Sequence, residues 1–136
     1  MLGGYCNMKV EIFEQTKRWM EKADRDLMAA EKLLEAGIYD YSLFHSQQAV
    51  EKYLKAFLTF HNKPFGKTHD LTYLLKKCIE IDVSFHELRE VEIDKLYPKG
   101  IEVRYPEFTL TVTEDDAKES IKIAEKVREF VLEKVE

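Results

Sequence analysis

The chain has 136 residues, of which 45% are hydrophobic and 35% charged, and its formal net charge is −5 at pH 7. This length and balance predict one soluble globular domain with a substantial core. The negative net charge argues against duplex nucleic-acid binding driven by overall charge, although it leaves room for a local basic pocket. No segment is long and apolar enough to span a membrane, and the N-terminus lacks the layout of a signal peptide, so we expect a cytoplasmic protein without membrane association.

The first predicted element is a long amphipathic helix. We expect residues 1–12 to form an N-terminal tail and residues 13–136 to form a single helical domain. From Phe13 to Ala36, apolar residues recur at spacings of three and four, which is the pattern of one helix face. Gly37 stands where a glycine commonly ends a helix.

A second helix is expected from Tyr39 or Asp40 to Phe60, and Asp40 is a suitable N-cap. Its apolar residues cover more than half of the helix circumference, so it is predicted to be central. Ser46 falls inside this apolar arc and Gln47 lies near its edge. We interpret Ser46 as a close-packing residue and Gln47 as a boundary amide, which costs about 1–3 kcal/mol if its two ends lack partners.

The remaining arc of this helix is polar. His45, Gln48 and Lys52 share one stripe, and Glu51 with Lys55 has the spacing of an ordinary solvated ion pair. One interpretation is a solvated helix face. The other is a phosphate or nucleotide site, with Lys52 as a point charge and Gln48 as a reader of the base.

The later elements are shorter. Thr68 is a suitable cap for a third helix, and a further short helix is expected from Phe85 to Leu96. Residues 97–112 are predicted to form a loop, because prolines and a glycine interrupt them. Thr113 and Asp116 have capping-box spacing at the start of the last helix. The whole pattern predicts an all-α, up-and-down helical bundle of about five helices, with two long antiparallel helices.

Two other segments carry candidate functional residues. His69 and Asp70 stand at a helix start, where Asp70 suits a cap and two residues are too few for a metal site. Arg104 and Tyr105 lie in the predicted loop, where Arg104 suits a phosphate and Tyr105 suits a base, although both also suit a structural role. No phosphate-binding glycine loop or other catalytic motif is present. We expect no metal and no cofactor.

Four segments in this order resemble the HEPN domain family (higher eukaryotes and prokaryotes nucleotide-binding) from about residue 15 to the end. They are Trp19-x3-Ala23-x2-Asp26-Leu27-x2-Ala30-x2-Leu33-Leu34, Gly37-x-Tyr39-x2-Ser42-x-Phe44-His45-x2-Gln48-Ala49-x-Glu51-Lys52-x-Leu54-Lys55-Ala56, Thr68-His69-Asp70-Leu71-x2-Leu74-Leu75 and Arg104-Tyr105-Pro106.

The resemblance implies a helical bundle, commonly a homodimer, that binds a nucleotide or RNA. It also implies a separately encoded minimal nucleotidyltransferase as partner. Carried onto this sequence, the implied nucleotide-binding residues are Gln48, Lys52, His69, Arg104 and Tyr105. We therefore expect a non-catalytic accessory domain that binds a nucleotide or nucleic-acid segment and assists that enzyme.

Two alternatives remain open. Many HEPN proteins are toxin-type ribonucleases with an Arg-x4–6-His motif near the last helix, and this sequence has no histidine after His86. Such an activity would therefore need a displaced base, such as His45 or His69. The other alternative is a pure protein-interaction or dimerisation module.

Overall fold

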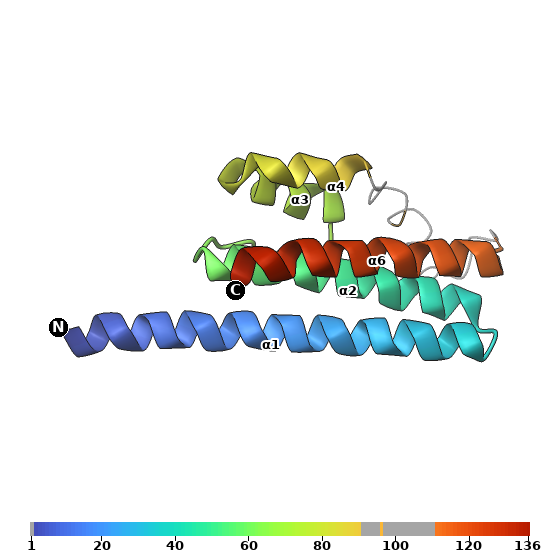
Figure 1. Cartoon of the computed structure of the whole chain (residues 1–136), viewed down its shortest axis with the longest axis horizontal. Coiled ribbons are helices and arrows are strands. Elements are labelled where there is room, and N and C mark those ends of the chain that lie inside the picture. The colour runs from blue at the N-terminus through green and yellow to red at the C-terminus, as the bar shows by residue number, and fades with distance from the viewer. Residues whose placement is uncertain (1, 91–95, 97–110) are drawn as a thin grey trace.

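The computed structural model is an all-α fold built around two long antiparallel helices, as the sequence predicts (Figure 1). It describes residues 2–90, 96 and 111–136, and within these residues there are five α-helices, one 3-10 helix and no strand. The elements are α1 (Leu2–Glu35), α2 (Tyr39–Phe60), α3 (Leu71–Ile81), the 3-10 helix η1 (Val83–His86), α4 (Glu87–Glu90) and α6 (Glu114–Val135).

The first helix is longer than its sequence pattern indicates. It begins at Leu2, so residues 2–12, which we expected to form a tail, continue α1. The N-terminal end of α1 extends beyond the ends of α2 and α6 (Figure 1). Apolar periodicity gives no clear signal in this stretch, where Met8 and Val10 are exposed.

The turn between α1 and α2 is set by Gly37, as predicted. Its φ of +78° is left-handed, a conformation that glycine adopts without steric cost. The amide of Ile38 donates to the carbonyl of Leu33 at 2.9 Å and that of Gly37 to Leu34 at 3.0 Å, which is a Schellman ending. The predicted N-cap role of Asp40 is wrong, because Ile38 holds that position and α2 already begins at Tyr39.

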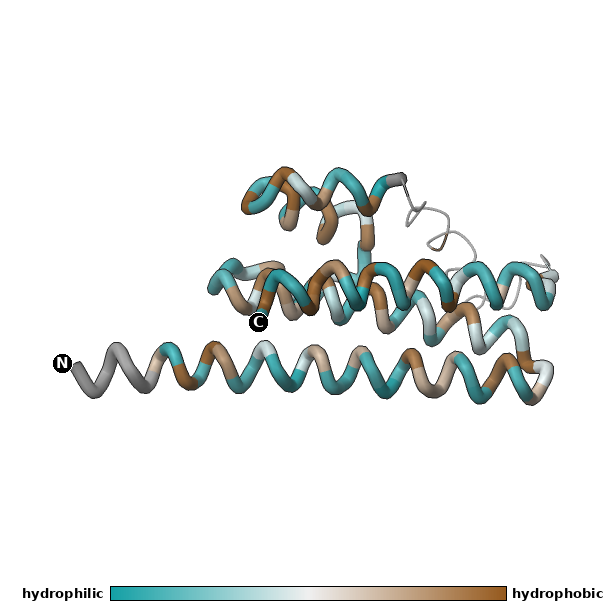
Figure 2. Tube along the Cα trace, viewed as in Figure 1, coloured by the Kyte–Doolittle hydropathy of each residue, from teal (hydrophilic) through white to brown (hydrophobic). Residues whose placement is uncertain are grey.

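Helix α2 is central to the bundle, as its broad apolar arc predicts. It packs against α1, α3 and α6, and α6 runs antiparallel to α1 and parallel to α2 (Figure 1). Brown and teal segments alternate along these helices, the pattern of amphipathic helices (Figure 2). The largest fully buried side chains are Tyr53, Phe57, Phe85, Leu43, Leu54, Leu58, Leu71, Leu74, Leu75, Leu88 and Gln47.

The caps of the later helices are only partly as predicted. Asp70, not Thr68, is the N-cap of α3, and its carboxylate accepts from the amides of Thr72 and Tyr73. Thr68 stabilises the turn before the helix, because its hydroxyl accepts from the amide of Asp70 at 3.1 Å. The capping box at the start of α6 is confirmed, with Thr113 and Asp116 each accepting from the other's amide.

The helix predicted from Phe85 to Leu96 begins as η1 at Val83 and continues as α4. Leu96 is helical and buried, whereas residues 91–95 lie outside the described part of the chain. The predicted loop at 97–112 is likewise described only at residues 111 and 112. Across residues 2–90, 96 and 111–136, no helix has the length and apolar character that crossing a bilayer requires.

Asp82 joins the end of α3 to the C-terminal part of α6, and this contact predicts an acid-sensitive term in stability. Hydrogen bonds from the hydroxyl and amide of Ser84, and then from Lys134 at 3.1 Å, lower the pKa of Asp82 to about 2. A lowered pKa stabilises the fold at pH values above the ordinary aspartate pKa, and that contribution disappears as pH falls from about 4 to about 2.

We expect Asp82→Asn to lower the melting temperature at pH 6. We also expect the melting temperature of this variant to fall less steeply than that of the native protein between about pH 4 and pH 2. Glu119→Gln, an exposed carboxylate of α6, is the control, and an Asp82→Asn curve parallel to that of the native protein would contradict the assignment.

Candidate functional site

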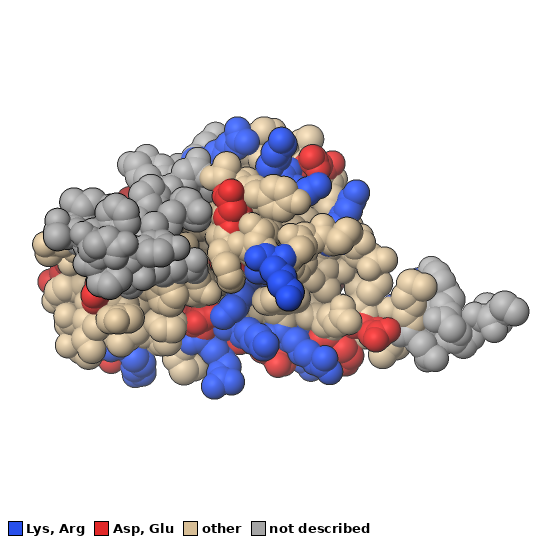
Figure 3. Space-filling view, turned by 180° about the vertical axis from the view of Figure 1, so that it is seen from behind, with Lys and Arg blue, Asp and Glu red and all other residues tan. Residues whose placement is uncertain are grey.

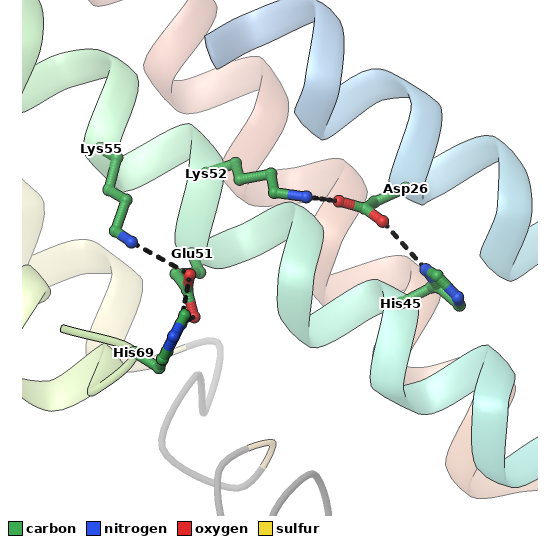
Figure 4. Close-up of polar contacts among 6 residues, drawn as sticks. All are labelled: Asp26, His45, Glu51, Lys52, Lys55 and His69. Atoms are coloured by element: carbon green, nitrogen blue, oxygen red, sulfur yellow. Dashed lines mark hydrogen bonds and ion pairs between the residues drawn. The ribbon is translucent and has the colours of Figure 1, made fainter. Parts of the chain in front are cut away.

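The predicted polar stripe of α2 meets a carboxylate of α1. Asp26 accepts a hydrogen bond from Nδ1 of His45 at 2.9 Å and forms an ion pair with the ammonium group of Lys52 (Figure 4). The side chain of Asp26 is 13% exposed and that of Lys52 is 24% exposed. Because partial burial limits screening by solvent, Asp26 fixes the direction of both partners, the imidazole of His45 and the ammonium group of Lys52.

A second carboxylate, Glu51 of α2, makes a separate set of contacts. Glu51 is 2% exposed, and it accepts from Lys55 at 3.1 Å and from Nδ1 of His69 at 3.0 Å (Figure 4). The prediction of a solvated Glu51–Lys55 pair is therefore wrong about its environment, although the pair itself forms. The polar arc is covered here by the segment that leads into α3, which brings His69 onto Glu51.

Aromatic rings complete the environment of Lys55. Its ammonium nitrogen lies 5.5 Å from the ring centroids of both Trp19 and Phe65. The two rings pack edge to face, with their centroids 6.0 Å apart. Ring faces attract a cation and compensate part of the cost of burying it. The buried Lys55 is thus a structural cation that joins α1, α2 and the segment before α3.

A shallow basic depression lies beside the first set of contacts. It has a volume of about 300 Å³ and is lined by Lys22, Arg25, Asp26 and Lys52. Lys22 and Arg25 lie on α1, three residues apart and therefore on the same helix face. Three cations surround one carboxylate, so the depression keeps an excess of positive charge after Lys52 pairs with Asp26. An anion of phosphate size suits this arrangement.

Four buried polar atoms of α2 lack hydrogen-bond partners among the described residues. They are the hydroxyl of Ser46, both ends of the Gln47 amide and the amide nitrogen of Gln48. Ser46 and Gln47 are each 0% exposed, so the sequence correctly places Ser46 inside the core, whereas Gln47 is more buried than a boundary residue. Ser42, one turn earlier, does bond across helices, from its hydroxyl to the carbonyl of Ala30 at 2.7 Å.

Gln47 therefore gives a prediction whose sign is unusual. A buried amide without partners costs about 1–3 kcal/mol, and methionine fills a similar unbranched shape without that cost. We expect Gln47→Met to raise the free energy of unfolding by about 1 kcal/mol, measured by urea denaturation. Gln15→Met, at an exposed position of α1, serves as the matched control. A loss of stability in Gln47→Met would show that the amide has partners.

The predicted site residues that the structure describes, Gln48, Lys52 and His69, do not all meet at one place. Lys52 points to Asp26 on α1, and His69 points to Glu51 on the other side of α2 (Figure 4). Gln48 lies one turn before Lys52, with its amide nitrogen buried. Arg104 and Tyr105 lie outside the described residues, so their part in the site stays a prediction. Across the described residues, no group of three or more histidine, cysteine, aspartate or glutamate side chains is placed to hold a metal ion.

Sequence reasoning missed the basic residues of α1. Arg18, Lys22 and Arg25 follow one another at spacings of four and three, which was the available signal. The sequence pattern also indicated no role for Arg128 of α6. In the structure, Arg128 donates to the carboxylate of Asp24 at 2.9 Å, and the hydroxyl of Tyr53 donates to the same atom at 2.6 Å. Burial, and then the contact with Asp24, raise the pKa of Tyr53.

These features define a helical bundle whose central helix is joined to its neighbours by contacts of Asp24, Asp26 and Glu51, with a basic depression between α1 and α2. The chain belongs to the HEPN domain family, whose family model matches residues 16–135. This confirms the resemblance seen in the sequence.

Known proteins with similar sequences and structures agree with this assignment. A protein of Methanocaldococcus jannaschii named "Putative toxin MJ1304" is 32% identical over 129 residues, covering 85% of this chain and 84% of that protein. The crystal structure of TT1696 from Thermus thermophilus has a TM-score of 0.79 at 29% identity, covering 88% of this chain and 98% of that one. The crystal structure of ST0689, described as an archaeal HEPN homologue, has a TM-score of 0.65 at 25% identity, covering 89% of this chain and 98% of that one.

Proposed function

We propose that this HEPN domain binds phosphate groups of a nucleotide or nucleic-acid segment without acting on them. The observation that carries the proposal is the depression in which Lys22, Arg25 and Lys52 surround Asp26. The chain as a whole carries a net charge of −5, so this local excess of cations is not a consequence of overall composition. A local basic site in an acidic protein attracts anions selectively to that place.

The residues of the depression have different tasks. Asp26 holds Lys52 in a fixed direction, so that its ammonium group acts as a placed point charge. Arg25 and Lys22 lie on the outer face of α1 and adjust to the ligand, and the guanidinium fork of Arg25 suits two phosphate oxygens at once. Arg104 and Tyr105 are proposed to complete the site.

We further propose the accessory role that the family resemblance implies. In this role the domain assists a separately encoded minimal nucleotidyltransferase, and it acts in the cytoplasm as a homodimer. The non-catalytic part of the proposal rests on the sequence, which lacks the Arg-to-His motif of the family's ribonucleases.

The test of phosphate binding is a thermal-shift titration with ATP and other nucleotides, with and without magnesium. We expect a nucleotide to raise the melting temperature of the native protein, because ligand binding to the folded state stabilises it. Lys52→Ala and Lys22→Ala should remove the shift, and Lys22 is exposed, so its loss leaves the fold intact. Lys126→Ala, which removes an exposed charge from α6, should keep it. The absence of a shift with every nucleotide, or its persistence in both site variants, would refute the proposal.

A second candidate function is RNA cleavage, and the Glu51–His69 contact favours it. The side chain of His69 is 59% exposed, and the buried carboxylate of Glu51 orients its Nδ1, so that Nε2 is the ring nitrogen not used in this contact. An oriented and exposed imidazole suits proton transfer. The M. jannaschii relative that is named a toxin gives this candidate additional weight. Incubation of RNA with the purified chain tests it: cleavage that is lost in His69→Ala and kept in His45→Ala would establish it, and intact RNA would exclude it.

A further inference from the structure

We infer that the ligand of the basic depression is a single-stranded nucleic acid, which lies along α1 in a groove that continues to the loop after α2. The inference rests on the proposed function, because the depression at Lys52 forms one end of this groove. It extends that function from an isolated phosphate to a polymer of several nucleotides.

Three neighbouring depressions make up the groove. The first, of about 300 Å³, is the one at Lys52, and it shares Lys22 with a second of about 170 Å³. The second shares Gln15 and Trp19 with a third of about 570 Å³, which reaches the loop after α2. The second depression is lined by Gln15, Arg18, Trp19 and Lys22. The third is lined by Gln15, Trp19, Thr59, Asn62, Lys63, Pro64, Phe65 and Gly66.

The charge of the groove suits a chain of phosphates. Arg18, Lys22 and Arg25 lie on one face of α1, and at 1.5 Å per residue they span about 10 Å along the helix. Lys52 and Lys63 add one cation towards each end, and Asp26 is the one acidic residue among the described residues that line the three depressions. Lys and Arg side chains gather along the lower edge of the molecule, over α1 (Figure 3). A row of cations over this length exceeds what one phosphate group uses.

The third depression offers what bases need. Trp19 and Phe65 line it together, and both are only partly buried. Bases stack on such rings whatever their sequence, and basic grooves with aromatic platforms are typical of proteins that bind single strands. Gln15 and Asn62 add amide groups, which donate and accept hydrogen bonds at the edges of a base. Trp19 and Phe65 already contact each other and Lys55, so a base would use only the parts of the rings that remain exposed. An acidic peptide without aromatic side chains would use the cations but has no flat ring to place there.

The single tryptophan of the chain, Trp19, lies in the groove and reports its occupancy. We would titrate the native protein with a nine-nucleotide uridine oligomer, a single-stranded DNA of the same length, uridine monophosphate and poly-glutamate, and follow Trp19 fluorescence. We expect both oligomers to change the emission and to bind at least tenfold more tightly than the mononucleotide. Contacts of Arg18, Lys22 and Arg25 with three phosphates predict a slope of about −2 for log affinity against log salt concentration.

Four variants connect the binding to the groove. Arg18→Ala and Lys22→Ala should each weaken the oligomer and reduce the salt slope by about 0.7. Phe65→Leu should weaken the oligomer about tenfold, because it removes a stacking surface, and should leave the mononucleotide unchanged. Lys126→Ala, which removes the same charge from α6, should leave both affinities unchanged.

Each outcome decides the matter. If the mononucleotide binds as tightly as the oligomers and Phe65→Leu has no effect, the proposed function stands and the groove is overturned. If poly-glutamate binds as tightly as the oligomers with the same change in emission, the site is a general polyanion surface and the inference fails. If neither mononucleotide nor oligomer binds, the proposed function fails as well.

Discussion

Replacing Glu51 by alanine is expected to lower the free energy of unfolding by about 3–5 kcal/mol, because it leaves a buried ammonium group without its carboxylate. The side chain of Lys55 is only 7% exposed, so water cannot replace Glu51 as its partner. The rings of Trp19 and Phe65 remain and offset part of the loss. Urea denaturation followed by circular dichroism measures the change.

An exposed pair with the same spacing is the control. Glu114 and Lys118 are also four residues apart, at 3.2 Å, but their side chains are more than half exposed. Glu114→Ala should change stability by at most about 0.5 kcal/mol, the usual range of surface pairs. The double variant Glu51→Gln with Lys55→Met should be much more stable than Glu51→Ala, because it buries no unpaired charge. A loss below about 1 kcal/mol in Glu51→Ala would contradict the burial of this pair.

Replacing Phe85 by alanine is expected to cost about 3–5 kcal/mol, the range for deleting a large buried ring. Phe85 is 0% exposed. The centroid of its ring lies 4.3 Å from the ring centroid of Phe57 in α2 and 4.9 Å from that of Phe130 in α6. It is therefore the residue through which η1 packs against the two central helices. Differential scanning calorimetry, or urea denaturation, measures the loss.

Val83 lies two residues earlier in the same 3-10 helix and is 74% exposed. Val83→Ala is therefore the matched control and should change stability by no more than about 0.5 kcal/mol. Equal losses in Phe85→Ala and Val83→Ala would show that η1 does not depend on this ring packing.

Local signals in the sequence predicted those parts of the fold that depend on neighbouring residues. The Gly37 ending and the Thr113–Asp116 capping box depend on a few adjacent amides, and both are present as predicted. Asp40 is not the cap because α2 begins directly after the Gly37 turn, with Ile38 at the N-cap position and no side chain capping it. The sequence does not fix which amide each carboxylate reaches, and Asp40 accepts from the amide of Tyr41 instead.

The candidate site depends on contacts between helices, and the sequence predicted less of it. A helical wheel shows which residues of α2 are polar, but not which elements cover them. For this reason Glu51 and Lys55 were expected in solvent, whereas the approach to α3 buries them. Its charge, its place on the polar stripe and the family resemblance made Lys52 a candidate phosphate ligand, but its partner Asp26 comes from another helix. The spacing of the basic residues of α1 was visible, and only the packing of α1 on α2 brings them beside Lys52.

The groove along α1 is proposed to bind phosphates, and nuclear magnetic resonance of the 15N-labelled protein would locate the residues that bind them. On titration with the nine-nucleotide uridine oligomer, we predict that the amide signals of residues 15–25, 52, 62, 63, 65 and 66 shift together. The signals of residues 118–126 in α6 should stay in place and serve as an internal control. Shifts confined to residues outside the groove, or no shifts at all, would contradict the claim.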